Sequence, residues 1–274
     1  MQLHFLGVFP PLVALLWQDR FARFTGRSPS ASERALLGIA TWLAYTLDGL
    51  WDVRGAGEGR EGLPRRHRFL LRHQGGLVVA SLLLLAVGLG LSTQLSMAHL
   101  LAAGLASGAV LAYLLLAQAA PRVMRGWFPR ELSVGLFFGV AVGLFTLRDM
   151  GRDLPALLAF ALLCAANGVA ISLDEEAEDR LRGDVTFATA HGRLGKVLRR
   201  VLHPLLLVLG GGLLVQGGLG VGIWGAGGLG ASLGLASVLL GLVPWLVRNR
   251  GLRPAAYDLA LCAPLLVWVF FKTT

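Results

Sequence analysis

The sequence predicts an all-α membrane protein built from about nine transmembrane helices. Of its 274 residues, 55% are hydrophobic and only 15% are charged, whereas soluble domains carry about 25% charged residues. Its apolar runs are long and show no period-two alternation, which favours helices over the strands of a membrane barrel. A backbone inside a bilayer must satisfy its own hydrogen bonds, and helices do so within each segment. We therefore expect residues 1–274 to form a single helical domain embedded in the lipid bilayer.

The first half of the chain contains four of the expected helices. They are Leu3–Trp17, Ala35–Leu50, Gly76–Leu91 and Ala98–Ala119. The first is interrupted by Pro10-Pro11 and reaches spanning length only if it continues to Phe24. A proline pair inside a helix removes backbone donors, so we expect the helix to be broken at Pro10-Pro11,.

The second half contains the other five helices. They are Leu132–Leu147, Leu154–Leu173, Val201–Gly217, Val221–Val247 and Ala255–Phe271. Asp153 and Pro155 are the expected cap and first-turn proline of the sixth helix,. The seventh and eighth are rich in glycine, which permits close helix packing.

The basic residues predict how the helices are oriented. The net charge is +9, and four loops that would share one side of the membrane are rich in arginine; they lie within 53–74, 121–131, 193–200 and 248–253. Basic loops face the cytoplasm, so we expect an integral protein of the bacterial inner membrane with these loops inside. The first loop is an exception, because Arg20, Arg23 and Arg27 lie on the opposite side. Either the first segment does not fully span the membrane, or a basic loop is tolerated there. Nucleic acid is not an expected partner, because no soluble domain presents the charge.

Two acidic clusters stand at the ends of expected helices, within residues 44–54 and 171–192, four helices apart. The first contains Asp48 and Asp52, and the second contains Asp174, Glu175, Glu178 and Asp179. Carboxylates four residues apart share a helix face and repel one another unless a cation lies between them. Mg²⁺ prefers such oxygen ligands. A solvated helix end would explain one acidic cluster, but the second cluster on the same membrane side favours a magnesium site.

Arginine and lysine residues near these clusters are candidates for binding an anion. Arginine pairs with phosphate oxygens through two parallel hydrogen bonds. The candidates for a diphosphate are Arg54, Arg60, Arg65, Arg125 and Lys196. Tyr45 is one turn before Asp48 on the same helix face and is expected to line the site.

The second cluster carries a motif that resembles the UbiA superfamily of intramembrane prenyltransferases. That motif is acidic and continues as D-R-x-x-G-x-x-T with a later glycine, and here it is Asp179-Arg180-Leu181-Arg182-Gly183-Asp184-Val185-Thr186 followed by Gly192. The resemblance implies that Glu175 and Asp179 hold Mg²⁺ and the substrate diphosphate, with Asp174 and Glu178 as adjacent candidates. It also implies a basic position at Arg125, an arginine at Arg60 or Arg65, and a UbiA-like bundle.

The first cluster departs from the family pattern. The family motif is N-D-x-x-D-x-x-x-D, and Asp48 and Asp52 match its last two aspartates, whereas Ala44 and Tyr45 replace the asparagine and the first aspartate. The departure removes one metal ligand and one amide.

We expect Mg²⁺-dependent transfer of a prenyl group from a polyprenyl diphosphate to an aromatic or lipid acceptor soluble in the membrane. Three alternatives stay open. A UbiA-like protein without activity would fit the incomplete first motif. A small-solute transporter would place ionisable residues inside its helices, and the fifth to eighth helices have essentially none. A CDP-alcohol phosphotransferase would share the Asp48-Gly49 pair but needs further aspartates that are missing after Asp52.

Overall fold

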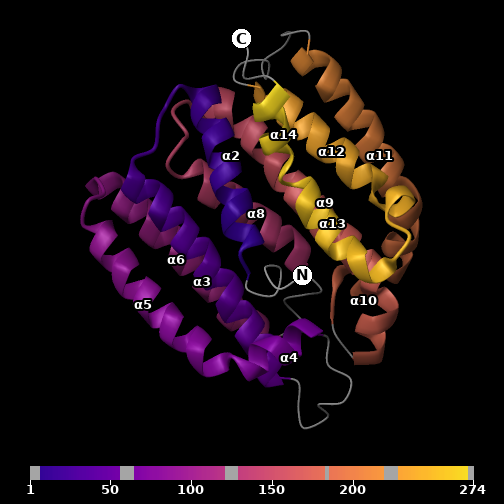
Figure 1. The fold of residues 1–274 in the computed structure, drawn as a ribbon, viewed down its shortest axis with the longest axis horizontal. Coiled ribbons are helices and arrows are strands. Elements are labelled where there is room, and N and C mark those ends of the chain that lie inside the picture. Colours follow the sequence, from indigo (N-terminus) through magenta and orange to yellow (C-terminus); the bar gives the residue numbers. More distant parts are fainter. Residues whose placement is uncertain (1–6, 56–64, 121–128, 183–184, 219–227, 271–274) are drawn as a thin grey trace.

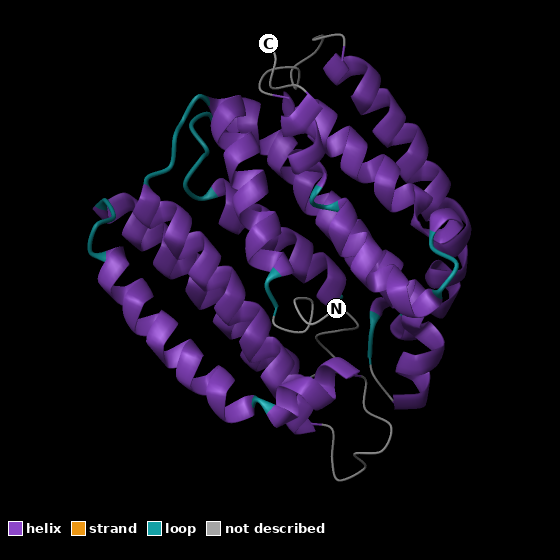
Figure 2. Cartoon of the chain, viewed as in Figure 1, coloured by secondary structure: helices purple, strands orange, loops and turns teal. Residues whose placement is uncertain are grey.

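The computed structural model describes residues 7–55, 65–120, 129–182, 185–218 and 228–270. The regular structure in these ranges is entirely helical (Figures 1 and 2), so the predicted all-α class is confirmed for this part of the chain. In order the elements are α2 (Phe9–Thr25), α3 (Ala31–Gly55), α4 (Arg65–Arg72), α5 (Gln74–Ser92), α6 (Met97–Ala119), α8 (Arg130–Gly143), α9 (Met150–Arg182), α10 (Phe187–Ala190), α11 (Gly192–Gly218), α12 (Leu229–Leu246), η3 (Arg250–Leu252), α13 (Arg253–Ala260) and α14 (Ala263–Phe270).

Five described helices are long and apolar enough to cross a membrane, which is consistent with an integral membrane protein. They lie in α5, α6, α9, α11 and α12. The other expected spans also contain helix, but they are shorter or more polar. α2 has 17 residues and α8 has 14, while the ninth segment consists of two eight-residue helices. The expected count of nine membrane crossings therefore stays a prediction.

The first expected helix lies further along the chain than predicted. It begins at Phe9 rather than Leu3 and continues through Arg20 to Thr25. Pro10 and Pro11 occupy its first turn, where no partner exists for a backbone N–H, so they start the helix instead of breaking it,. Gly26 ends it in a left-handed conformation with φ 67°,.

Two segments expected to be basic loops are partly helical. Residues 65–72 form α4, and 193–200 form the first turns of α11. Arginine and lysine are good helix formers. The basic residues of 65–72 therefore form a helix of their own, α4, and those of 193–200 form the start of α11. The charge marked the end of each apolar run, which is not the end of the helix.

α9 is the longest helix, with 33 residues. Its length is about 50 Å, whereas a bilayer core is about 30 Å thick. Its cap is Asp149 and not Asp153: the Asp149 Oδ1 atom accepts the N–H of Gly151 at 2.9 Å. The Asp153 carboxylate instead accepts the N–H groups of Arg148 and Asp149, at 2.9 and 3.0 Å. Together the two aspartates close the turn that joins α8 to α9.

The ninth expected helix is divided between α13 and α14. Pro264 has no N–H to continue the helical ladder, and two side chains of α2 bind carbonyl groups at the division. Trp17 Nε1 donates to the Leu261 carbonyl and Arg20 Nη2 donates to the Pro264 carbonyl, each at 2.8 Å. Trp17 is fully buried and Arg20 is 6% exposed, so this contact is part of the interior.

Glycine determines the two closest helix pairs. An added Cβ at Gly135 of α8 would lie 2.5 Å from the Ala161 carbonyl oxygen of α9. An added Cβ at Gly234 of α12 would lie 2.7 Å from the Gly210 carbonyl oxygen of α11. The predicted close packing of the seventh and eighth helices is therefore confirmed, and α8 with α9 is a second case. By contrast, α5 and α6 expose most of their leucines, as lipid-facing helices do.

Candidate functional site

Both acidic clusters lie at one end of the bundle. α4, which follows α3, and α10, which follows α9, both lie in the lower part of Figure 1. The start of α8 contacts both clusters. Arg130 forms an ion pair with Asp48 of α3. Its neighbour Glu131 accepts the Phe187 N–H with Oε1 at 2.9 Å, at the point where α10 begins after the second cluster.

The first cluster is described only in part. The Asp48 side chain is 24% exposed and faces Arg130. Asp52 and Arg54 lie in the last turns of α3, but their side chains are outside the described part of the chain, as is that of Arg65. Arg60 and Arg125 lie wholly outside the described residues. Tyr45 is half-buried and its ring packs edge-on against Phe138 of α8, with centroids 6.3 Å apart.

The acidic residues of the second cluster point in different directions around α9. Asp179 is only 4% exposed, although it is near the end of the helix. Glu175, one turn earlier on the same face, is half-buried, and Glu178 is exposed. Glu176 pairs with Arg199 of α11 and, one turn later in α9 itself, with Arg180, whose Nη2 lies 2.6 Å from its Oε1 atom. Glu175 and Asp179 are therefore the pair that faces inward together.

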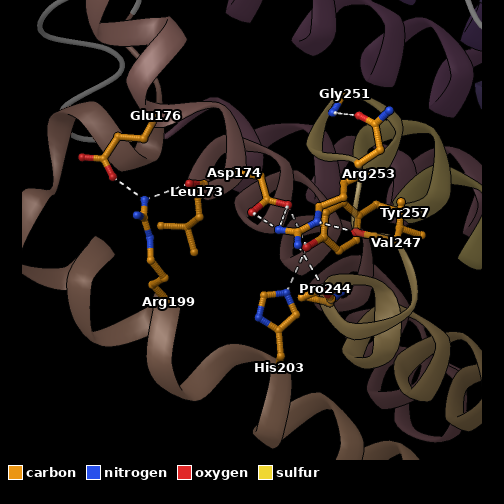
Figure 3. A network of polar contacts seen from close by, with 11 residues as sticks. Leu173, Asp174, Glu176, Arg199, His203, Pro244, Val247, Gly251, Arg253 and Tyr257 are labelled. Carbon is orange, nitrogen blue, oxygen red and sulfur yellow. Dashed lines mark hydrogen bonds and ion pairs between the residues drawn. The ribbon is translucent and has the colours of Figure 1, made fainter.

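Asp174 belongs to a polar network between α9, α11 and α13 (Figure 3). Arg253 Nη1 lies 3.2 and 3.4 Å from its two carboxylate oxygens, and the Tyr257 hydroxyl donates to Oδ2 at 3.2 Å. The Tyr257 hydroxyl proton is therefore engaged with Asp174, and the Tyr257 oxygen acts as the acceptor for His203 Nε2–H, 3.1 Å away,. Arg253 also donates to the Pro244 and Val247 carbonyls, at 3.0 and 2.9 Å. The Asp174 carboxylate thus joins α9 to α13 and to the end of α12.

Sequence reasoning missed two buried polar residues beside the clusters. Glu131 is 7% exposed, and its Oε2 atom has no hydrogen-bond partner among the described residues. Asn167 donates to the Asp258 Oδ1 atom at 3.1 Å, joining α9 to α13. Glu131 is isolated in the sequence, and no second acidic residue lies three or four positions away to mark it as part of a cluster. The fact that Glu131 directly follows the arginine-rich loop was the only available hint.

The donors suit a magnesium ion shared with a substrate. Among the described residues, no group of three or more His, Cys, Asp or Glu side chains forms a ready cluster. Mg²⁺ usually takes one or two carboxylates and completes its shell with waters and substrate phosphates. Glu175 and Asp179 on one face of α9 provide such a pair, and Asp48 lies at the same end of the bundle. Lys196 is exposed in the second turn of α11, near the end of α9.

No protein-family model, curated protein or solved structure matches this chain. The residues at this end of the bundle and their contacts are therefore the basis of the functional proposal.

Proposed function

We propose that the protein is a Mg²⁺-dependent intramembrane prenyltransferase. It would move a prenyl group from a polyprenyl diphosphate to an aromatic or lipid acceptor. One observation supports this most: two successive residues at the start of α8 contact the segments that carry the two acidic clusters. Arg130 pairs with Asp48, and Glu131 accepts the N–H of Phe187, eight residues after Asp179.

In this proposal the carboxylates bind the diphosphate through Mg²⁺, and the basic residues bind its oxygens directly. Glu175 and Asp179, with Asp48 and Asp52, would hold Mg²⁺, which neutralises charge on the departing diphosphate. Arg54, Arg60, Arg65, Arg125 and Lys196 would pair with the remaining phosphate oxygens. Arg130 already lies beside Asp48 and would add a further cation there. Glu178, which is exposed, stays an adjacent metal candidate, whereas Asp174 pairs with Arg253 and would hold α9 in position.

The bond changes in the proposed reaction are simple. The bond between the first prenyl carbon and the diphosphate oxygen breaks, and the electron pair leaves with the diphosphate. The prenyl carbon forms a bond to a carbon or oxygen of the acceptor, which gives up a proton. The site's contribution is to stabilise the charge that grows on the diphosphate, a contribution greater in the transition state than in the ground state.

A second candidate is a UbiA-like protein that binds but does not transfer. The contacts of Asp48 and Asp174 favour it, because each already pairs with an arginine, Arg130 and Arg253. Charges balanced by protein side chains need no metal for stability. This candidate predicts binding of a prenyl diphosphate, or none, without product.

The test is incubation of the purified protein with labelled prenyl diphosphates of several chain lengths, Mg²⁺ and a membrane-lipid extract as acceptor. We expect a labelled, solvent-extractable product that disappears when a chelator removes Mg²⁺. If no donor gives a product, and if Asp179→Asn leaves the affinity for the diphosphate unchanged, the prenyltransferase proposal is wrong and the non-catalytic candidate takes its place.

A further inference from the structure

A groove follows α2 at the other end of the bundle. One part has a volume of about 360 Å³ and is lined by α2, by Arg34 of α3 and by Pro264 and Leu265 of α14. The next part, about 390 Å³, continues past the end of α2 to Arg27. Both parts share Asp19, Arg23 and Arg34, so they form one continuous hollow, called here the α2 groove.

The α2 groove is remote from the acidic clusters. Arg152, in the first turn of α9, donates to the Phe24 carbonyl at 3.2 Å and lies over the Phe24 ring. Asp179 is 27 residues later in the same helix, which is about 40 Å along the axis. The last turns of α2 and α14 lie in the upper part of Figure 1, opposite α4 and α10. The groove is therefore a separate site and does not depend on the proposed reaction.

One half of the α2 groove is apolar. Leu12 and Leu265 are 39% and 44% exposed, and with Leu15 and Leu16 they line the first part of the groove, whereas the second part has no leucine in its lining. In a bilayer, exposed leucine side chains such as these contact lipid tails, so their exposure carries no free-energy penalty.

The other half of the α2 groove is cationic. Four arginines line it, Arg20, Arg23, Arg27 and Arg34, and the lining includes one carboxylate, that of Asp19. Arg27 also pairs with Glu33, beside the groove, at 3.0 Å. Asp19 pairs with Arg23 at 2.9 Å. Arg34 donates through Nε to the Pro29 carbonyl at 3.3 Å and has no carboxylate partner in the described ranges. The four arginines outnumber the two carboxylates that pair with them, so the groove has an excess of positive charge that favours an anion.

The two halves together fit an amphiphile with an anionic head. Leu12 and Arg23 are 11 residues apart in α2, about 16 Å, which is the length of a lipid from its headgroup into its tail. Guanidinium groups pair with phosphate oxygens in two parallel hydrogen bonds. We infer that the α2 groove binds one anionic phospholipid, with its phosphate between Arg23 and Arg34 and a tail along the leucines.

This site gives the basic first loop a role. Arg20, Arg23 and Arg27 oppose the side on which the other arginine-rich loops lie. Arg20 is partly used inside the protein, at the Pro264 carbonyl, and the other two line the lipid site. The first loop is then an exception because it binds a headgroup, not because the first helix fails to cross.

The experiment measures retained lipid on the full-length protein. The detergent-purified chain is equilibrated with phosphatidylglycerol or phosphatidylcholine, and bound lipids are counted by native mass spectrometry. We expect wild type to retain one phosphatidylglycerol in preference to phosphatidylcholine. The pair Arg23→Gln and Arg34→Gln should weaken phosphatidylglycerol binding by roughly tenfold or more, because charge-assisted hydrogen bonds are lost.

The controls separate a lipid site from general charge. Arg148→Gln removes an exposed arginine at the same end of the bundle but outside the groove, and lipid retention should not change. Leu16→Trp fills the apolar half and should lower lipid retention while leaving inorganic phosphate binding unaffected. Equal loss in Arg148→Gln, unchanged retention in the double variant, or displacement of the lipid by millimolar phosphate would each overturn the inference. Thermal midpoints identify a variant that has lost its fold, in which case Arg34→Gln and Leu16→Trp decide.

Discussion

At the residue scale, burial separates Asp179 from the other acidic residues of α9. It is 4% exposed, and it faces inward with Glu175. If these carboxylates hold Mg²⁺ against the leaving diphosphate, their loss removes stabilisation that exists mainly in the transition state. We expect Asp179→Asn and Asp52→Asn each to lower the turnover rate at least about 10²–10³-fold, with a smaller change in substrate binding. Initial rates against donor concentration separate the two.

Two matched changes in the same helix serve as controls. Asp149→Asn should leave the rate nearly unchanged, because asparagine caps a helix as well as aspartate does and this cap is at the far end of α9,. Glu176→Gln should be milder than Asp179→Asn, because Glu176 faces Arg180 and Arg199. A rate loss in Glu176→Gln as large as in Asp179→Asn would show that the proposed inward face is wrong.

Arg253 offers a prediction about stability. It donates to Asp174, Pro244 and Val247, and its side chain is 15% exposed. Arg253→Gln leaves the partly buried Asp174 without its cation, so we expect the free energy of unfolding to fall by about 2–3 kcal/mol. Arg250→Gln, an exposed neighbour, should change it by less than about 0.5 kcal/mol,. Equal thermal midpoints for the two variants would contradict the structural role of Arg253.

The acidic residues themselves could be found in the sequence, but their partners could not. Four-residue spacing placed Glu175 and Asp179 on one helix face, which the structure also shows. The same spacing could not indicate that Asp174 faces Arg253, 79 residues later, because a pairing between distant helices depends on how the bundle packs. Arg253 was interpreted as a topological charge, and Glu131 gave no pattern at all.

At the scale of elements, glycines that repeat every fourth residue lie against another helix in α8 but not in α6. Gly135, Gly139 and Gly143 repeat every fourth residue on α8 and contact α9, whereas Gly104 and Gly108 repeat likewise on α6 with nothing within 4 Å of an added Cβ. Such motifs allow close backbone contact only where a partner helix is present. Sequence spacing alone could not distinguish the two.

The matched glycines give a test of helix packing. Gly135→Ala places a methyl group 2.5 Å from the Ala161 oxygen and 2.7 Å from the Ala165 nitrogen. Helices α8 and α9 must then separate, which should cost about 1–3 kcal/mol. Gly104→Ala should instead be neutral or stabilise by up to about 1 kcal/mol, because alanine is the better helix former. The thermal midpoints of the two variants measure this difference, and equal shifts would rule out close α8–α9 packing.

Element boundaries were less predictable than element existence, for identifiable reasons. The apolar pattern located each expected segment, but Pro10 and Pro11 proved to start a helix, and the basic run 193–200 proved to belong to one. Pro264 marks the division of the ninth segment. A proline shows that the ladder is interrupted, but whether it starts, kinks or divides a helix depends on the groups that bind the freed carbonyls. Here Trp17 of another helix binds the Leu261 carbonyl before the proline, and Arg20 binds the carbonyl of Pro264 itself.

At the scale of the whole molecule, the short helix α8 decides the topology. Of the described helices between the two acidic clusters, only α5, α6 and α9 are long and apolar enough to count as spans. Three crossings would place the clusters on opposite sides of the membrane. In the structure, however, α8 begins beside Asp48 and its C-terminal end joins the start of α9, so it traverses the bundle. If α8 therefore also crosses the membrane, four crossings place the second cluster on the side of the first.

We therefore predict that 53–74 and 180–200 face the same side of the membrane, the cytoplasm by the positive-inside rule. Single cysteines replacing the exposed Arg72 and Arg193 should react with an impermeant maleimide from one side, and cysteines replacing Thr93 and Arg148 from the other. The native Cys164 and Cys262 are buried, which keeps the background low. Labelling of positions 72 and 193 from opposite sides would mean that α8 does not cross. No membrane-embedded site could then include both acidic clusters, and the prenyltransferase proposal would fail with the topology.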